Sequence, residues 1–278
     1  MMKIKGTVYI VITAILFSIG GACVKLVPWS PMAINSARNI ISVIIIGIYL
    51  IKTKHKIVVN RYVLLGALCL CATTTLYVYA NKLTTAANTI VLQFTAPIFV
   101  IFILWIFMKE RPRKLEITTC LFVFSGIVCF FVDGLSSGNT LGNFLAILSG
   151  LSYAGVFMMK SMPDSDSFSS IIIGQALGAV IGVPFLFQET DFSMPAITGI
   201  VLLGVFQLGL AYIFFSKGME TTSPVAASLI AAIEPILNPV WVAIFFKETV
   251  GALAVAGAVI VVGSIVSYEV IKEKQCPA

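Results

Sequence analysis

Residues 232–241, AIEPILNPVW, place an acid, an amide and two prolines inside a long apolar run. A plain hydrophobic membrane helix does not accommodate such residues. Ionisable side chains are costly in hydrocarbon, and a proline lacks the N–H that would bond one helical turn back. The stretch is therefore either a broken helix that helps to build a binding site, or a loop that only resembles a membrane segment. The rest of the chain distinguishes these alternatives.

Composition places the whole chain in a lipid environment. Of 278 residues, 59% are hydrophobic and 11% are charged, and the mean hydropathy is +1.04. An average soluble domain carries roughly 25% charged residues, so this composition predicts a polytopic membrane protein. The net charge of +6 comes mainly from Lys and Arg between apolar runs, which does not indicate nucleic-acid binding. The single His and six Cys show no metal-ligand spacing, so we expect no metal site and no disulfide. No cofactor is expected either.

A membrane-spanning helix needs about 20 mainly apolar residues. The sequence contains ten such segments and predicts an all-α integral membrane protein with no soluble domain. The expected spans are 5–26, 32–51, 62–81, 86–108, 115–133, 141–160, 168–187, 196–216, 224–246 and 250–271.

Charge asymmetry predicts the orientation. Ten spans place both termini on one side, and the segments on that side carry fourteen Lys and Arg against three on the opposite side. Positively charged loops remain in the cytoplasm. We therefore expect a plasma-membrane protein with both termini cytoplasmic.

An internal repeat divides the chain. FMKE at 107–110 matches FFKE at 245–248, a difference of 138 in residue number. Further pairs share this or a similar offset: Pro97 with Pro235, Gly66 with Gly204, Thr84-Thr85 with Thr222-Ser223, and, at 136, Gly6 with Gly142 and Phe17-Ser18 with Tyr153-Ala154. The repeat predicts two five-helix units, 1–135 and 136–278. Because five is odd, the second unit should be inverted, an arrangement typical of secondary transporters with a central substrate cavity near the midplane.

Several motifs resemble those of a known family. They are a Pro followed thirteen residues later by Glu in each half (Pro97/Glu110 and Pro235/Glu248), GVFQLGLAY at 204–212, AAIEP at 231–235, and Arg38. Together the chain resembles the EamA-type drug/metabolite transporters over essentially its whole length. The resemblance implies transport of a small organic metabolite, with export as the implied direction. It does not specify the substrate, because members carry amino acids, amines, nucleotide-related metabolites and drugs.

Two ionisable residues lie deep in predicted spans and are candidates for function. Glu234 could bind a cationic substrate group or a coupling proton, or it could cap a half-helix that begins at Pro235. Arg38 is expected to be a structural ion-pair or hydrogen-bond partner, and it shares a helix face with Asn35 and Asn39. The first repeat carries no acid at the matching position.

Uncharged residues complete the candidate site. Glu234, Asn238 and Trp241 form a stripe on one helix face that we expect to line the cavity. Further candidates are the amides within the spans and the aromatic residues that could contact a substrate: Gln93, Gln175, Gln207, Phe17, Tyr77, Tyr79, Phe94, Tyr153 and Tyr212. The alternative for each amide is interhelical packing, and for each Tyr it is anchoring at the membrane interface. Phe17 and Tyr153 are repeat-equivalent and are predicted to face each other across the cavity.

These patterns predict a secondary transporter of an amine or amino-acid-like metabolite, working by alternating access. No nucleotide-binding loop or hydrolase motif occurs, so no enzyme activity is expected. The expected partners are the small-molecule substrate and the lipid bilayer, with proton or ion coupling left open and a monomer favoured. The alternatives are an uptake carrier for a quaternary amine and a membrane channel or scaffold.

Overall fold

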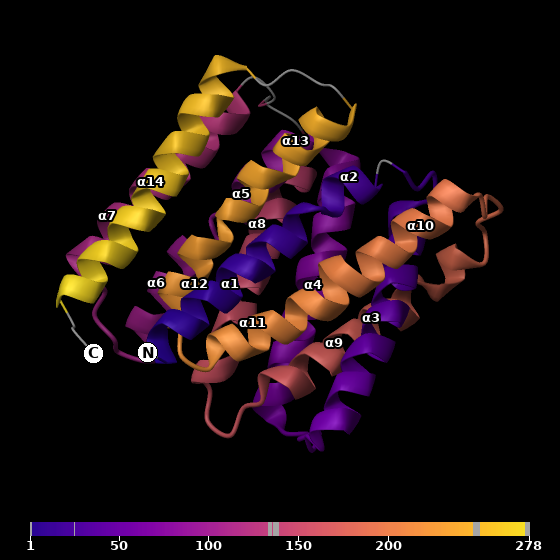
Figure 1. Cartoon of the computed structure of the whole chain (residues 1–278), viewed down its shortest axis with the longest axis horizontal. Helices are drawn as coiled ribbons and strands as arrows, with labels where there is room; N and C mark the ends of the chain where they lie inside the picture. Colours follow the sequence, from indigo (N-terminus) through magenta and orange to yellow (C-terminus); the bar gives the residue numbers. More distant parts are fainter. Residues whose placement is uncertain (1, 25, 133–134, 136–138, 247–250, 276–278) are drawn as a thin grey trace.

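The computed structural model describes residues 2–24, 26–132, 135, 139–246 and 251–275, and within these ranges every regular element is helical. Labelled as in Figure 1, the α-helices are α1 (Met2–Ser18), α2 (Gly20–Val24), α3 (Pro31–Thr53), α4 (Arg61–Leu83), α5 (Ala86–Gln93), α6 (Ala96–Phe107), α7 (Lys114–Phe131), α8 (Thr140–Met158), α9 (Ser167–Leu186), α10 (Met194–Leu202), α11 (Ala211–Met219), α12 (Pro224–Ala231), α13 (Ile233–Phe246) and α14 (Ala252–Gln275). A short 3₁₀ turn, η2 (Met159–Ser161), follows α8, and a π-helical segment, η3 (Leu203–Leu210), joins α10 to α11.

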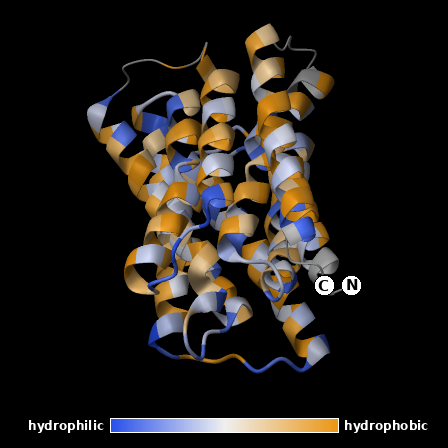
Figure 2. Cartoon of the chain, turned by 90° about the vertical axis from the view of Figure 1, so that its left-hand side faces the viewer, coloured by the Kyte–Doolittle hydropathy of each residue, from blue (hydrophilic) through white to orange (hydrophobic). Residues whose placement is uncertain are grey.

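Nine of the ten predicted spans are confirmed as helices that are long and apolar enough to cross a membrane, counting only the described residues. The tenth, 224–246, is not confirmed as a span, because the apolar helix found there covers only Pro224–Asn238. Figure 2 shows hydrophobic residues along most of each helix and hydrophilic residues gathered at the connections. The fold is that of a multi-pass membrane protein.

The two proline-containing spans break at equivalent places. α5 ends at Gln93 and α12 at Ala231, each four residues before a proline, Pro97 or Pro235. In a continuous helix the N–H of residue 97 or 235 would bond to the carbonyl of Gln93 or Ala231, and a proline has no N–H to form this bond. Both half-helices are eight residues long and differ by 138 in residue number at each end.

The starts of these half-helices match as well. The Thr85 hydroxyl accepts the N–H of Asn88 over 3.1 Å, and the Ser223 hydroxyl accepts that of Ala226 over 3.4 Å. A side-chain oxygen at this position satisfies one of the free N–H groups at a helix start. The local structure therefore reproduces the repeat that the sequence offset predicts.

Repeat-equivalent helices also pack against each other. α3 packs along α9, and α7 packs along α14 at one edge of the bundle (Figure 1). Gly126 and Gly257 allow the α7 and α14 backbones to touch, since a Cβ on either would meet the partner's main chain. α14 also contacts α1, where the Thr7 hydroxyl donates to Glu269 over 3.2 Å. The beginning of α1 and the end of α14 thus lie at the same end of the bundle.

A polar contact joins the α3–α4 and α8–α9 connections at this end of the bundle, which we call the basic end because Lys52, Lys54, Arg111 and Arg113 lie there. His55 Nε2 lies 3.0 Å from Asp166 Oδ2, and Asp166 also accepts the backbone N–H and the hydroxyl of Ser169 at the start of α9. Burial raises the pKa of the Asp166 carboxyl, but the hydrogen bonds from Ser169 and His55 outweigh burial and hold this pKa below its usual value. The charged form of Asp166 is therefore favoured in the folded protein.

Candidate functional site

Glu234 lies in the first turn of α13, directly after the break at Ala232. Its side chain keeps part of its surface accessible. Nothing in the described ranges forms a hydrogen bond or an ion pair with its carboxylate. The alternative in which Glu234 caps the half-helix is therefore not supported, because a cap would accept a backbone N–H.

Four polar groups lie near this carboxylate. Glu234 lies within electrostatic range of the Arg38 guanidinium and of the hydroxyls of Tyr77, Tyr153 and Tyr212. Arg38 and Tyr77 belong to the first repeat, whereas Tyr153, Tyr212 and Glu234 belong to the second. The arrangement gathers one acid, one base and three phenol groups between the repeats.

Arg38 is held by amide oxygens rather than by an acid. Its Nη2 and Nε donate to Asn35 Oδ1 over 2.8 and 3.3 Å, and its Nη1 donates to Gln207 Oε1 over 3.2 Å. The expected hydrogen-bond role of Arg38 and its shared face with Asn35 are confirmed. A guanidinium has five N–H donors, so two remain after these three bonds. Gln207 lies in η3, and its bond to Arg38 connects the two repeats.

The other two residues of the stripe continue along α13. The Trp241 indole Nε1 donates to the Ser18 hydroxyl over 2.8 Å, at the end of α1. Asn238 lies one turn beyond Glu234 and is likewise partly accessible, with no hydrogen bond among the described residues. Glu234 and Asn238 therefore present polar groups that no described neighbour satisfies.

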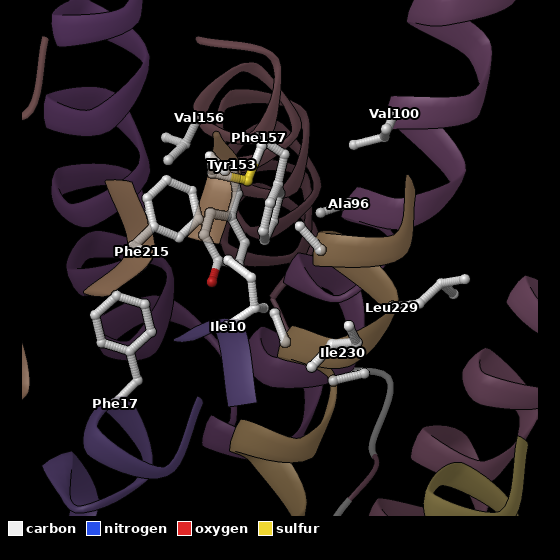
Figure 3. Close-up of a cluster of buried hydrophobic side chains, with 14 of the residues drawn as sticks. Ile10, Phe17, Ala96, Val100, Tyr153, Val156, Phe157, Phe215, Leu229 and Ile230 are labelled. Atoms are coloured by element: carbon white, nitrogen blue, oxygen red, sulfur yellow. The ribbon is translucent and has the colours of Figure 1, made fainter. Parts of the chain in front are cut away.

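Aromatic rings form a packed row beside these groups. Rings of Phe17 and Tyr212 have centroids 5.1 Å apart, Tyr212 and Phe215 5.9 Å, Phe215 and Phe157 5.7 Å, and Phe157 and Tyr153 4.8 Å. Figure 3 shows Phe157, Phe215 and Tyr153 close together with Phe17 beyond them. These side chains are at most 7% exposed. The rings of Tyr212, Phe215 and Phe157 link Phe17 to Tyr153 in this row, and the cavity expected between the pair is not confirmed.

Comparison with known proteins assigns the family. The family model of the EamA-like transporter family matches the chain twice, over residues 4–132 and 140–268. The chain belongs to the EamA-like transporter family. The two matches also establish its two-repeat architecture.

Individual relatives of this EamA-like protein are transporters by name. It is 25% identical to human solute carrier family 35 member G1 over 96% of this chain and 79% of that protein. It is 28% identical to an uncharacterized transporter of Archaeoglobus fulgidus over 69% of this chain and 70% of that protein. A solved crystal structure superimposes with a TM-score of 0.83 at 13% identity, covering 97% of this chain and 98% of the other, and this likeness concerns the fold alone.

Three residues that the sequence predicted for the site of this EamA-like protein do not belong to the group around Glu234. Gln93 Nε2 donates to Ser149 Oγ over 2.9 Å, which is the packing alternative. Gln175 is buried in α9, and neither of its amide atoms has a hydrogen-bond partner in the described ranges. Tyr79 is 42% exposed and lies about 200° around α4 from Tyr77, so it faces outward.

The predicted central cavity is not confirmed. A cavity of about 450 Å³ lies elsewhere, at the basic end of the bundle between the α6–α7 connection, α12 and α14. No group of three or more His, Cys, Asp or Glu that could hold a metal occurs within the described ranges.

Phe215 was not among the residues predicted for the candidate site. The repeat offered a signal for Phe215, since 77 + 138 = 215 makes it the counterpart of Tyr77. Tyr212 was predicted only as one aromatic residue among several, because Thr74 occupies the matching position in the first repeat and the repeat does not single it out. Its place beside Glu234 depends on how α11 is rotated, which hydropathy does not determine.

Proposed function

We propose that this EamA-like protein is a secondary transporter that exports a small amino-acid-like or amine metabolite by alternating access. The two repeats, 1–135 and 136–278, are inverted relative to each other, and the protein lies in the plasma membrane with both termini cytoplasmic. Contacts between equivalent helices support this arrangement, since the pairs α3–α9 and α7–α14 are those that a two-fold axis in the membrane plane would bring together.

The observation that carries the proposal is the unsatisfied, partly accessible carboxylate of Glu234 between the repeats. A carboxylate in this position can accept hydrogen bonds from a substrate ammonium group. Its neighbours Tyr77, Tyr153 and Tyr212 add hydroxyls that can donate or accept. Substrate binding would provide the partners that Glu234 lacks in the protein alone.

Arg38 favours a substrate that also carries an anionic group. Two of its N–H donors are not used by Asn35 or Gln207. A guanidinium recognises carboxylates through such paired donors. An α-amino acid or a similar zwitterion would place its carboxylate at Arg38 and its ammonium at Glu234. A quaternary amine, the uptake alternative, would instead need open aromatic faces, and the row from Phe17 to Tyr153 is packed.

The substrate can be found by thermal unfolding of the purified protein against amino acids, amines and quaternary amines. A ligand that binds only the folded state raises its stability with the logarithm of the ligand concentration above Kd. A hit should then show saturable counterflow in proteoliposomes, with uptake stimulated by substrate inside. A channel or scaffold shows no such stimulation, and stabilisation by quaternary amines alone would replace the zwitterion proposal.

Glu234→Gln tests the site itself. We expect counterflow and ligand stabilisation to fall at least tenfold, because an amide keeps the shape of the side chain but loses its charge. Glu220→Gln is the matched control, since Glu220 is an exposed acid between spans. Unchanged transport in Glu234→Gln, with the same pH dependence as the wild type, would exclude both substrate binding and proton coupling by this residue.

A further inference from the structure

A second site lies far along the bundle from Glu234, in the cavity of about 450 Å³ at the basic end. Its walls come from the connection between α6 and α7, the start of α12 and the last turns of α14. The volume falls within the range of about 300–1,000 Å³ that is typical of small-ligand pockets. The site contributes nothing to the transport proposal above.

The charges around this cavity favour an anion. Arg111, Arg113 and Lys272 line it together with Glu110 and Glu116, which leaves an excess of one positive charge. Glu116 Oε2 accepts the backbone N–H of Arg113 over 2.9 Å, so this acid is already engaged in capping α7. Arg111 is exposed, and no hydrogen bond or ion pair engages it within the described ranges.

The same cavity has an apolar wall. Ile101, Leu104 and Val225 line it beside the ring of Tyr268, which is 2% exposed. Lys272 Nζ lies 5.3 Å from the centroid of this ring, which positions the ammonium at the mouth of the cavity. A second contact, 3.7 Å from Lys272 Nζ to Glu269 Oε1, is longer than a good hydrogen bond. A charged mouth above an apolar wall matches a molecule with a phosphate and a hydrocarbon chain.

The helices that contribute to the cavity also have apolar outer surfaces. α7 and α14 form the edge of the bundle (Figure 1), and α14 exposes Val266 and Val270 on its outer surface. Phe107, at the end of α6, is 78% exposed. Lipid therefore surrounds the elements that form the walls of the cavity, and basic pockets between membrane helices bind anionic headgroups.

We propose that this cavity binds the headgroup of an anionic phospholipid, with its phosphate between Arg111, Arg113 and Lys272 and an acyl chain along the apolar wall. The single negative charge of phosphatidylglycerol balances the excess charge of the lining. Arg111 and Arg113 precede α7 in the first repeat, whereas Lys272 ends α14 in the second. One bound lipid therefore connects the two repeats.

The test compares binding of phosphatidylglycerol and phosphatidylcholine to the purified full-length protein in detergent, by native mass spectrometry and by thermal unfolding. The wild type should bind phosphatidylglycerol saturably and be stabilised by it more than by phosphatidylcholine. In Arg111→Gln/Lys272→Gln the affinity for phosphatidylglycerol should fall about thirtyfold, because each cation near an anionic lipid contributes about fivefold. Arg111→Lys/Lys272→Arg should retain most of the affinity.

Lys52→Gln/Lys56→Gln is the matched control, since it removes the same charge from exposed residues at the end of α3 and in the following connection. It should change the affinity by less than about twofold. Equal loss in this control, or no preference for phosphatidylglycerol in the wild type, would overturn the proposal. Equal stabilisation by inorganic phosphate or glycerol phosphate would also overturn it, by assigning a soluble anion. If the double variant fails to fold, Arg111→Gln alone should still weaken binding about fivefold.

Discussion

The hydrogen bond from Trp241 to Ser18 provides a quantitative test of how the two repeats are joined. The indole Nε1 donates to Ser18 Oγ over 2.8 Å, and Ser18 Oγ donates onward to the Ile15 carbonyl over 2.7 Å. Ser18 is fully buried. The repeat places Ile103 (241 − 138) and Ala154 (18 + 136) at the matching positions, and these cannot form such a bond. The bond therefore exists in one half of the molecule only.

Its expected contribution follows from these contacts. A neutral hydrogen bond contributes about 0.5–1.5 kcal/mol net, and measured couplings in a membrane protein average about 0.6 kcal/mol with a maximum near 1.7. The short distance and the buried acceptor place this bond in the upper half of that range, so we expect a coupling of about 1 kcal/mol between Trp241 and Ser18. That free energy corresponds to about a fivefold change in an equilibrium constant. Trp241→Phe alone should cost more, because the smaller ring also loses packing.

A double-mutant cycle isolates the bond. The free energy of unfolding would be measured by denaturant titration for the wild type, Trp241→Phe, Ser18→Ala and the double variant. A second cycle that pairs Ser18→Ala with Trp105→Phe serves as control, since the Trp105 ring is 51% exposed and makes no hydrogen bond among the described residues. The control should be additive within about 0.5 kcal/mol. A coupling below about 0.3 kcal/mol for Trp241 and Ser18 would refute the reasoning.

Three further perturbations have definite expected outcomes. Gly182→Leu should unfold the protein or lower its free energy of unfolding by more than about 3 kcal/mol, because a side chain at this position would meet the α3 backbone. Gly47 has open space around it, so Gly47→Leu should change the unfolding temperature little. Leu229→Ala should cost about 2–3 kcal/mol in denaturant titration through the cavity it leaves, since Leu229 is fully buried. Asp166→Asn should lower the free energy of unfolding most above about pH 5, and progressively less as the pH falls through the usual aspartate pKa of about 4 and below it. The reason is that the pKa of this carboxyl is lowered in the folded protein, so the carboxyl stabilises the fold only in its charged form beside His55. A pH-independent difference between the two proteins would contradict this last prediction.

The fold was predictable where hydropathy or the internal repeat can be read directly along the sequence. Hydropathy located nine spans, and the offset of 138 paired Pro97 with Pro235, one turn before which α5 and α12 end at Gln93 and Ala231. Proline chemistry explains why both breaks lie one turn before Pro97 and Pro235. The π-helical segment η3 carried no such signal. Its Gly204 lies against Ile41 of α3, a contact between residues far apart in the sequence.

The site was predictable as a set of residue types but not as an arrangement. The cost of burying charge identified Glu234 and Arg38, and helical spacing placed Asn35 beside Arg38. Gln207 reaches Arg38 from 169 residues away, which depends on the rotation of two packed helices. Helical spacing places Tyr77 and Tyr79 on different faces of α4, but the rotation of α4 in the bundle decides that Tyr79 is the exposed one. Sequence spacing gives the face of one helix, and only packing decides what that face meets.

The difference between the two repeats supports a single off-axis site. Ala96 and Val100 of α6 occupy the positions equivalent to Glu234 and Asn238, and they are 1% and 0% exposed (Figure 3). Glu234 and Asn238 of α13 remain partly accessible at the corresponding places. The first half-helix thus closes its side of the bundle with apolar packing, while the second leaves polar groups without partners among the described residues. A symmetric fold with two equivalent acids would offer two competing sites related by the two-fold axis. Alanine at one of the two positions leaves a single acid, so that under the proposed function a zwitterionic substrate would bind in one orientation only, with its ammonium at Glu234 and its anion at Arg38.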